Sequence, residues 1–459
     1  MSSTVMRNSA GLPPWYADSN GHFAVEKLRS HFEAKKHLNA LGLESTVLSL
    51  TLRGVTPNTS YFSRGLSASD FTSYQIVEPG DLILRLIDLS NTVSSRVGYV
   101  AQRGVVSPAY VRLTPRGTLD TRFAYWQLTD LNNRSVFHAL SGGVRATLSA
   151  SELLRMPFVV PPLDIQVKVA KYLDHAEIRF AKAISAKQAM IALLREREQR
   201  ALLAAISETS GERRTDPRVE WLGSFPDHWD IARLGSLLEE RGEVNHNGHV
   251  TQVLSLVRKR GVMRYEDKGN IGNQKSEDVA RYKIVRNGDI VLNSMNVIIG
   301  SVGLSEYTGC LSPVYYVLKP RSSAHSSAYF NALFQIERFH SSLVRFGKGI
   351  LAHRLRIPMI ELKTVMLPVA PPAEQAEIAE RVATATQVLR SSLGAIEREI
   401  ALLKEYRVKL ISDVVTGKLD VTKEAAGLPD IDPEELAHVQ SGASSGTMGD
   451  EEGDVDGDD

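Results

Sequence analysis

The sequence predicts an α+β protein in which two β-rich domains form a pseudo-twofold repeat and are separated by two long helices forming an antiparallel coiled coil. Three observations predict this fold. Two stretches of sequence return about 206 residues later, each copy is rich in short β-branched and aromatic runs, and each copy runs into a long helical stretch. A fixed internal period indicates duplicated structural units, which are called heads below.

The repeat is carried by two long matches. YQIVEPGDLIL, from Tyr74 to Leu84, returns as YKIVRNGDIVL, from Tyr282 to Leu292. GVVSPAYVRLTP, from Gly104 to Pro115, returns as GCLSPVYYVLKP, from Gly309 to Pro320. Gly, Pro, Asn and Ser separate the apolar runs in both copies, which is the pattern of short strands joined by turns.

A Gly-Asp pair follows the first strand of each match, at Gly80-Asp81 and at Gly288-Asp289. Glycine accepts the positive φ that such turns require, and aspartate can accept hydrogen bonds from nearby backbone. We therefore expect a hairpin or a strand-to-strand corner at both places, with a structural role.

Helical patterns follow the Pro-Pro pair that ends each head. From Asp164 to about Ile206 the chain holds no Pro or Gly and is rich in Ala, Leu, Lys, Arg, Glu and Gln, which favours helix. Apolar residues recur at helical spacing on one stripe of each stretch. The stripes are Leu173, Phe180, Ile184, Ile191 and Leu194 in the first, and Ile378, Val382, Ala385, Leu389, Leu393, Ile396, Ile400, Leu403 and Leu410 in the second. Each stripe needs an apolar partner, so we expect the two helices to pair in opposite directions.

These elements give five segments. We place the first head at residues 1–160, the first long helix at 161–212, the second head at 213–370, the second long helix at 371–420 and an acidic tail at 421–459. The tail has low hydrophobicity and charge of one sign, so we expect it to be disordered.

Charge is unevenly distributed along the chain. The net charge is +1, but 12 Asp and Glu and no Lys or Arg lie from Glu424 onward. The remainder holds 54 Lys and Arg against 41 Asp and Glu, a surplus of 13 that favours a polyanionic partner. A single cysteine, Cys310, excludes a disulfide within the chain, and no signal sequence or apolar span is evident, so we expect a cytoplasmic protein.

The sequence resembles the specificity subunit of type I restriction-modification systems. The resemblance is carried by FPDHWDIARLGSL (Phe225 to Leu237), by GDIVLNSMNVIIGSVGLSEYTGCLSPVYYVLKP (Gly288 to Pro320), by PVAPPAEQAEIAERV (Pro368 to Val382) and by LISDVVTGKLDV (Leu410 to Val421). The first head departs from this pattern, since Arg85 stands where the second head has Asn293, and PPLDIQVKVA has no exact counterpart of the Glu374-Gln375 pair.

The resemblance implies that each head is a target-recognition domain that reads one half of a bipartite DNA target. It also implies that the helices set the spacing and dock DNA methyltransferase subunits, and that restriction and translocase subunits join the complex. S-adenosylmethionine, ATP and Mg would then belong to the partner subunits, with no cofactor bound by this chain.

Motifs of catalysis were sought and not found in the sequence. There is no GxxxxGK[ST] phosphate loop, no GxGxxG turn, no HExxH, and no Asn-Pro-Pro or Asp-Pro-Pro followed by an aromatic residue. We therefore expect a chain that is not an enzyme by itself.

Candidate DNA contacts are Arg, Lys and Asn residues in loops where the two heads differ. Arginine and lysine bind phosphates, arginine can bind guanine, and asparagine can bind adenine. In the first head the candidates are Arg53, Arg85, Asn91, Arg96 and Arg145, and in the second they are Arg258, Lys259, Arg260, Arg264, Asn293, Asn296, Lys348 and Arg354. For each residue the alternative is an ordinary structural role, such as an asparagine that caps the backbone after a turn.

The alternative to a DNA-recognition protein is a non-enzymatic, protein-binding tether, in which two duplicated heads hold proteins and the helices space them. Steep salt dependence of binding to duplex DNA would favour the first hypothesis, and its absence would favour the second.

Overall fold

The computed structural model describes most of the chain. The described residues are 23–51, 54–58, 71–89, 96–142, 146–208, 211–246, 248–258, 260–269, 275–276, 278–347 and 355–431. Helices and strands alternate throughout these ranges, so the expected α+β class is confirmed.

The chain divides into two compact units. Unit 1 holds Met1–Gln188 and Glu397–Ser445, and unit 2 holds Ala189–Ile396 and Gly446–Asp459. Each unit therefore contains one head and half of both long helices. This division differs from the five segments expected from the sequence, because the long helices pack onto the heads rather than forming separate domains.

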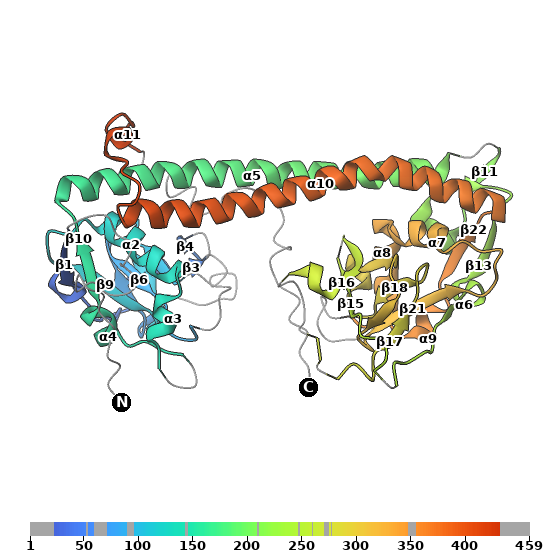
Figure 1. The fold of residues 1–459 in the computed structure, drawn as a ribbon, viewed down its shortest axis with the longest axis horizontal. Helices are drawn as coiled ribbons and strands as arrows, with labels where there is room; N and C mark the ends of the chain where they lie inside the picture. The colour runs from blue at the N-terminus through green and yellow to red at the C-terminus, as the bar shows by residue number, and fades with distance from the viewer. Residues whose placement is uncertain are drawn as a thin grey trace. The chain divides into compact units, whose positions relative to one another are not determined.

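The described residues of the first head form ten strands in four small sheets (Figure 1). The strands are β1 Ala24–Lys27, β2 Phe32–Glu33, β3 Leu48–Thr51, β4 Gly54–Pro57, β5 Gln75–Val77, β6 Leu82–Leu84, β7 Val97–Tyr99, β8 Gly104–Val106, β9 Val111–Pro115 and β10 Pro157–Val160. The largest sheet has the order β2-β9-β6-β7, and the pairs β1-β10, β3-β4 and β5-β8 surround it. All the paired strands are antiparallel.

The second head repeats this topology strand for strand. Its strands are β13 Asp230–Arg233, β14 Leu238–Glu240, β15 Leu254–Val257, β16 Gly261–Arg264, β17 Lys283–Val285, β18 Ile290–Asn293, β19 Val302–Leu304, β20 Gly309–Leu311, β21 Tyr315–Pro320 and β22 Met366–Val369, preceded by the short pair β11 Arg213–Arg214 and β12 Phe225–Pro226. The four-stranded sheet has the order β14-β21-β18-β19, and the pairs are β13-β22, β15-β16 and β17-β20. The internal repeat predicted from the sequence is thus a repeat of fold.

Short helices complete both heads. The first head contains η2 Leu28–Ser30, α2 Thr121–Asn133, α3 Val136–Leu140 and α4 Ala150–Arg155. The second contains η4 Pro217–Leu222, α6 Leu234–Leu237, η5 Tyr265–Lys268, η6 Val297–Ile299, α7 Ser327–Phe334, α8 Glu337–Leu343, η7 Val344–Phe346 and α9 Met359–Leu362. The N-caps of α2 and α7 correspond, since the side chain of Asp120 accepts from the Phe123 amide and that of Ser326 accepts from the Tyr329 amide.

The long helices are α5, Leu163–Ser207, and α10, Pro372–Val415. In unit 1, Arg407 Nε donates to Glu177 at 2.6 Å and Lys187 pairs with Glu399. In unit 2, Arg390 Nε donates to Glu198 at 2.6 Å and Arg381 Nε donates to the Ala205 carbonyl at 3.2 Å. Residue numbers rise along one helix as they fall along the other, so the helices are antiparallel in both units, as predicted.

The predicted apolar stripes are buried or partly buried except at one position, and the partly buried residues are Phe180, Ile184, Leu194, Leu389, Ile400 and Leu403. Leu173, Ile191, Ile378, Val382, Leu393, Ile396 and Leu410 are all buried. Ala385 is exposed, and its neighbour Thr386 is buried instead, with its hydroxyl donating to the Val382 carbonyl at 2.8 Å. That internal bond satisfies the hydroxyl group, so a threonine can occupy a buried position that the sequence pattern assigned to the alanine.

Each long helix begins with a buried glutamine that joins it to its head. Gln166 donates to the Pro161 carbonyl at 2.7 Å and accepts from the Asp120 amide at 2.7 Å. Gln375 donates to the Ala370 carbonyl at 2.8 Å and accepts from the Ser326 amide at 2.8 Å. Gln166 is therefore the structural counterpart of Gln375. Only the glutamine is matched, so PPLDIQVKVA has no exact counterpart of the Glu374-Gln375 pair, as the sequence indicated.

A carboxylate of each long helix accepts a hydrogen bond from a tryptophan of the head, but the two carboxylates have different surroundings. In the first head, Asp174 accepts from Trp126 Nε1 at 2.8 Å and forms a buried ion pair with Arg122, whose Nε lies 3.1 Å away. In the second head, Glu374 accepts from Trp229 Nε1 at 2.9 Å and contacts His228 at 2.7 Å, and this pair is partly exposed. His228 therefore has a hydrogen-bonding role.

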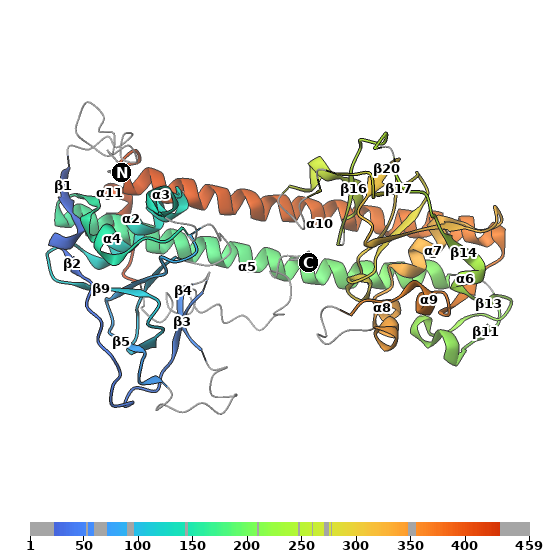
Figure 2. The ribbon, with the colours of Figure 1, turned by 90° about the horizontal axis from the view of Figure 1, so that it is seen from below.

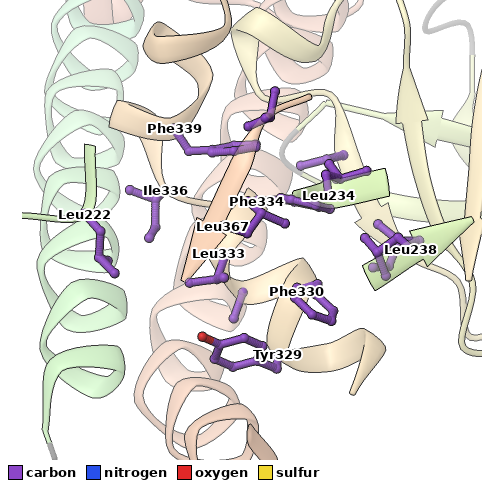
Figure 3. Packing of buried hydrophobic residues seen from close by; sticks show 14 of the residues in the cluster. Leu222, Leu234, Leu238, Tyr329, Phe330, Leu333, Phe334, Ile336, Phe339 and Leu367 are labelled. Atoms are coloured by element: carbon purple, nitrogen blue, oxygen red, sulfur yellow. The ribbon is translucent and has the colours of Figure 1, made fainter. Parts of the chain in front are cut away.

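The ends of both helices belong to the hydrophobic cores of the heads. Leu410, Ile411, Val414 and Val415 of α10 pack into the core of the first head. The core of the second head gathers Leu202 and Ile206 of α5 with Ile378 of α10 around the aromatic residues of α7 and α8 (Figure 3). The first head thus buries the start of α5 and the end of α10, and the second head buries the start of α10 and the end of α5.

The segment after α10 is ordered, which corrects the predicted start of the tail. Helix α11, Thr422–Ala426, follows α10, and Val421 and Ala425 are buried. Lys171 of α5 then pairs with Asp430 at 2.7 Å. Two buried side chains and this ion pair hold residues 421–431 against unit 1; the rest of the predicted tail, residues 432–459, lies outside the described residues.

Candidate nucleic-acid interface

The two Gly-Asp turns have the same structural role in the two heads. Gly80 and Gly288 have φ of 92° and 87°, which glycine adopts without strain. The buried Asp81 accepts from the Glu78 amide at 2.8 Å, and the buried Asp289 accepts from the Arg286 amide at 2.8 Å. The turns are strand-to-strand corners, because β5 and β6 lie in different sheets, as do β17 and β18.

Each of these aspartates is neutralised by an arginine, and the arginine comes from a different strand in each head. Arg112 of β9 pairs with Asp81 at 2.7 Å, whereas Arg241, directly after β14, pairs with Asp289 at 2.8 Å. The valine that follows Tyr316 in β21, Val317, stands where the first head has Arg112. The sequence repeat signals the shared aspartate, but the arginines occupy unmatched positions and were missed.

The loop that follows β6 is held by Arg96. This side chain is 3% exposed and donates to the carbonyls of Ile87 at 2.8 Å and Asp88 at 2.5 Å. Burial lowers the pKa of Arg96, and the positive charge of Arg85 lowers it further. Asp88 has a φ of 54°, a conformation that these two bonds help to hold. Arg96 is therefore a structural residue and not a base-reading one, which corrects the prediction.

The corresponding loop of the second head corrects two more predictions. Asn293 and Asn296 are 4% and 7% exposed. The side-chain oxygen of Asn293 accepts from the Met295 amide at 3.0 Å, and Asn296 precedes the single turn η6. Buried amides committed to the fold cannot reach a base edge. For Asn293 the structure supports the alternative interpretation, an asparagine that caps backbone after a turn, whereas the side chain of Asn296 makes no capping bond to η6.

The hairpin β15–β16 carries exposed positive charge in the second head. Arg260 lies in its turn and is exposed, and Arg264 ends β16, also exposed, with its guanidinium 5.6 Å from the centre of the Tyr307 ring. Arg258 donates to the Ile299 carbonyl at 2.8 Å, so the hairpin turn lies against η6. The hairpin and the loop after β18, far apart in sequence, therefore form one surface with Arg260 at its edge.

The remaining candidates are less fully described. Arg85 is partly exposed and its amide donates to the Arg96 carbonyl at 3.0 Å. Six candidates lie outside the described residues, namely Arg53, Asn91, Arg145, Lys259, Lys348 and Arg354.

The described ranges hold neither a candidate membrane-spanning helix nor a candidate metal site. None of their helices is long and apolar enough to cross a membrane. No three His, Cys, Asp or Glu side chains in those ranges are grouped as ligands for a metal ion.

Comparison with known proteins gives a match of fold. No protein-family profile and no curated protein sequence matches the chain. Among solved structures, a chain from a structure described as the structural basis of complex assembly and conformational transition of the type I R-M system has 13% identity and a TM-score of 0.58, over 88% of this chain and 100% of that one.

Two further structures are similar over a comparable length. They are the HsdS subunit from Thermoanaerobacter tengcongensis, with 13% identity and a TM-score of 0.39 over 87% of this chain and 98% of that one, and the type I restriction-modification S subunit from M. genitalium, with 13% identity and a TM-score of 0.38 over 87% and 97%. The first match, at a TM-score of 0.58, shows that this chain has the fold of a type I R-M component.

Proposed function

We propose that the chain is the DNA sequence-recognition subunit of a type I restriction-modification complex, in which each head reads one half of a bipartite target. The observation that carries the proposal is the exact repetition of the strand order in two heads whose exposed loops differ. A shared framework with different loops is what two unlike half-sites require, because specificity comes from side chains that reach base edges.

The exposed arginines of the second head supply the contacts. Arg260 and Arg264 lie on hairpin β15–β16 with no carboxylate between them in the sequence, and both side chains are exposed. Phosphate contacts of this kind fix the position of a protein on a duplex, while one or two arginines can read guanine. The surplus of positive charge outside the acidic tail supports the same polyanionic ligand.

The helix pair supports a role in docking the methyltransferase subunits. Several apolar side chains of α5 and α10 remain exposed, among them Leu193 at 67% and Val388 at 72% in unit 2 and Leu402 at 63% in unit 1. A coiled-coil pair that is already closed along its own stripe has no internal use for these side chains. Methyltransferase subunits, and through them restriction subunits, are the partners that the proposal assigns.

The proposal makes this chain non-catalytic. Methylation, cleavage and translocation would belong to the partner subunits, which would bind S-adenosylmethionine, ATP and Mg. The protein would work in the cytoplasm, where the DNA of a bacterial cell lies.

Replacement of one head tests the division of labour. Residues 23–160 are exchanged for the equivalent head of another specificity subunit, and the chain is expressed with its methyltransferase. Mapping of methylated bases should then show a new sequence in one half-site and the original sequence in the other. An unchanged target, or a change in both half-sites, would refute the proposal.

A protein-binding tether remains the second candidate, favoured only by the exposed apolar residues of the helices. Affinity of the full chain for duplex DNA should fall steeply between about 50 mM and 200 mM salt if several phosphates are contacted. A tether would show no such affinity.

A further inference from the structure

A rigid turn follows β2 in the first head. The buried side chain of Asn39 donates to the Glu44 carbonyl at 2.9 Å and accepts from the Glu44 amide at 3.1 Å. Gly42, at a φ of 62°, donates its amide to the Asn39 carbonyl at 2.8 Å. One asparagine thus closes the turn from both sides, and the glycine takes the left-handed position.

The second head contains the same turn. Asn245 donates to the Val250 carbonyl at 2.9 Å and accepts from the Val250 amide at 3.1 Å. Gly248 has a φ of 62°, and its amide donates to the Asn245 carbonyl at 2.8 Å. The framework residues are therefore identical in kind and in geometry, and only the side chains displayed between them can distinguish the two turns.

The displayed side chains differ at the position after the glycine. In the first head, Leu41 and Leu43 are each 82% exposed. In the second head the position that matches Leu43 holds His249, which is exposed, and the position that matches Leu41 is residue 247, which lies outside the described residues. Two leucines held in water on a rigid turn contribute nothing to the core of the head, so their use must lie outside it.

The charge next to this turn selects the partner. Lys35, Lys36 and His37 lie shortly before the turn, separated from Asn39 by Leu38, and all three are exposed. Figure 2 shows the chain between β2 and β3 extending away from α5, so the long helix of the same unit does not cover it. Lysines beside an apolar tip fit a duplex, whose phosphates attract the ammonium groups while thymine methyl groups offer apolar contact in the major groove.

We propose that Leu41 and Leu43 read thymine in the half-site of the first head, with the Asn39 turn as the rigid support and Lys35 and Lys36 on flanking phosphates. This inference rests on the proposed DNA-recognition function and names two of its specificity-determining residues. The second head would then display His249 at the position of Leu43 because its half-site differs.

The test compares the full chain with its Leu41→Ser/Leu43→Ser variant. Each is mixed with a library of randomised duplexes, and the bound duplexes are sequenced. The wild-type chain should enrich two blocks of sequence. In the variant, the enrichment of thymine over the other bases should fall about tenfold at one or two positions of one block. The other block should be unchanged.

A matched control separates the recognition of bases from sequence-independent attraction to phosphates. Lys35→Gln/Lys36→Gln should weaken binding to all duplexes alike and reduce the salt dependence, with the preferred sequence kept. Both leucines are exposed, so the serine variant should melt at the wild-type temperature.

The outcomes distinguish failure of the proposed role of the turn from failure of the proposed DNA-recognition function. If the wild type enriches two blocks and the serine variant enriches the same two with equal preference, the role of the turn is wrong and the proposed function stands. The same holds if the variant keeps both blocks but no longer binds methyltransferase subunits, because the leucines would then contact protein. If the wild type enriches no sequence, both proposals are overturned.

Discussion

The two heads differ most where each one meets the end of a long helix. In the second head, Leu333 and Ile336 are fully buried beside Leu222 in an apolar cluster (Figure 3). Counted from the capping residues Asp120 and Ser326, the matching positions of the first head are Gln127 and Asp130, which are also buried. The place where a head meets the end of a long helix is called the joint. The joint has the same topology in both heads, but it is lined by apolar residues in the second head and by polar residues in the first.

The polar joint is incompletely satisfied by protein groups. Within the described ranges, neither the oxygen nor the nitrogen of the Gln127 amide has a hydrogen-bond partner, and one oxygen of Asp130 has none. The other oxygen pairs with Arg134 at 2.5 Å. Since buried polar groups without partners cost free energy, the first head should be joined to its helices less stably than the second.

The largest effect is expected at the tryptophan-binding carboxylates. Asp174→Ala leaves the buried Arg122 without its counter-ion, so the free energy of unfolding of unit 1 should fall by about 3–5 kcal/mol. Glu374→Ala in the second head should cost only about 1 kcal/mol, because this carboxylate is partly exposed and binds His228 and Trp229. Urea denaturation with hydrogen exchange on peptides from each head measures both; equal losses would contradict the comparison.

A polar residue in the apolar joint should have the next largest effect. Leu333→Gln places an amide in the position that Gln127 occupies in the first head, and the surrounding cluster offers it no partner. We expect a loss of about 3 kcal/mol from the apolar burial and from the unsatisfied amide together. Leu333→Met, which keeps the volume, is the matched control and should cost about 1 kcal/mol.

The reverse exchange should stabilise the first head. Gln127→Leu removes two buried polar atoms that lack protein partners, so the free energy of unfolding should rise by about 1–2 kcal/mol. Slower hydrogen exchange in α2 would confirm it. A loss of stability would show that ordered water satisfies the amide, and the joint would then be a hydrated one.

The smallest effect concerns pH. Burial raises the pKa of Asp130, and Arg134, Ser412 and Lys418 oppose that shift. A raised pKa in the folded state means that the folded protein binds this proton more tightly, so this group's contribution to stability is lost as pH rises through the folded pKa. Asp130→Asn should therefore gain stability relative to the wild type as pH rises above about 4, the ordinary pKa of an aspartate, and the gain should level off above the folded pKa. A difference that does not change with pH would contradict this.

The repeat and the helical stripes could be predicted because both are patterns of many residues. Tyr74 to Leu84 and its copy fix the repeat, and the seven-residue spacing fixes the pairing of α5 with α10. The antiparallel direction followed from the need of each stripe for a partner, and Arg407 and Arg390 confirm it.

The candidate interface was predicted less well, because a residue type does not reveal where its side chain points. Arg96, Asn293 and Asn296 have the donors that base reading requires, but all three are buried. Arg96 donates to a backbone carbonyl, and the side-chain oxygen of Asn293 accepts from a backbone amide. The turn at Asn39 was missed because its signal is a similarity of framework, Asn-x-x-Gly, between segments that otherwise share little. An alignment of the two repeats that looks for the same turn residues, with different residues between and after them, would have found it.

The most direct test of the central claim lengthens the two helices together. Seven residues are inserted after Gln188 in α5 and seven after Ile396 in α10, which preserves the apolar stripe. Seven helical residues add about 10 Å, or about three base pairs of duplex. Mapping of methylated sites should show the same two half-sites separated by about three more unread base pairs. An unchanged spacing, or a change in the bases that are read, would contradict the account.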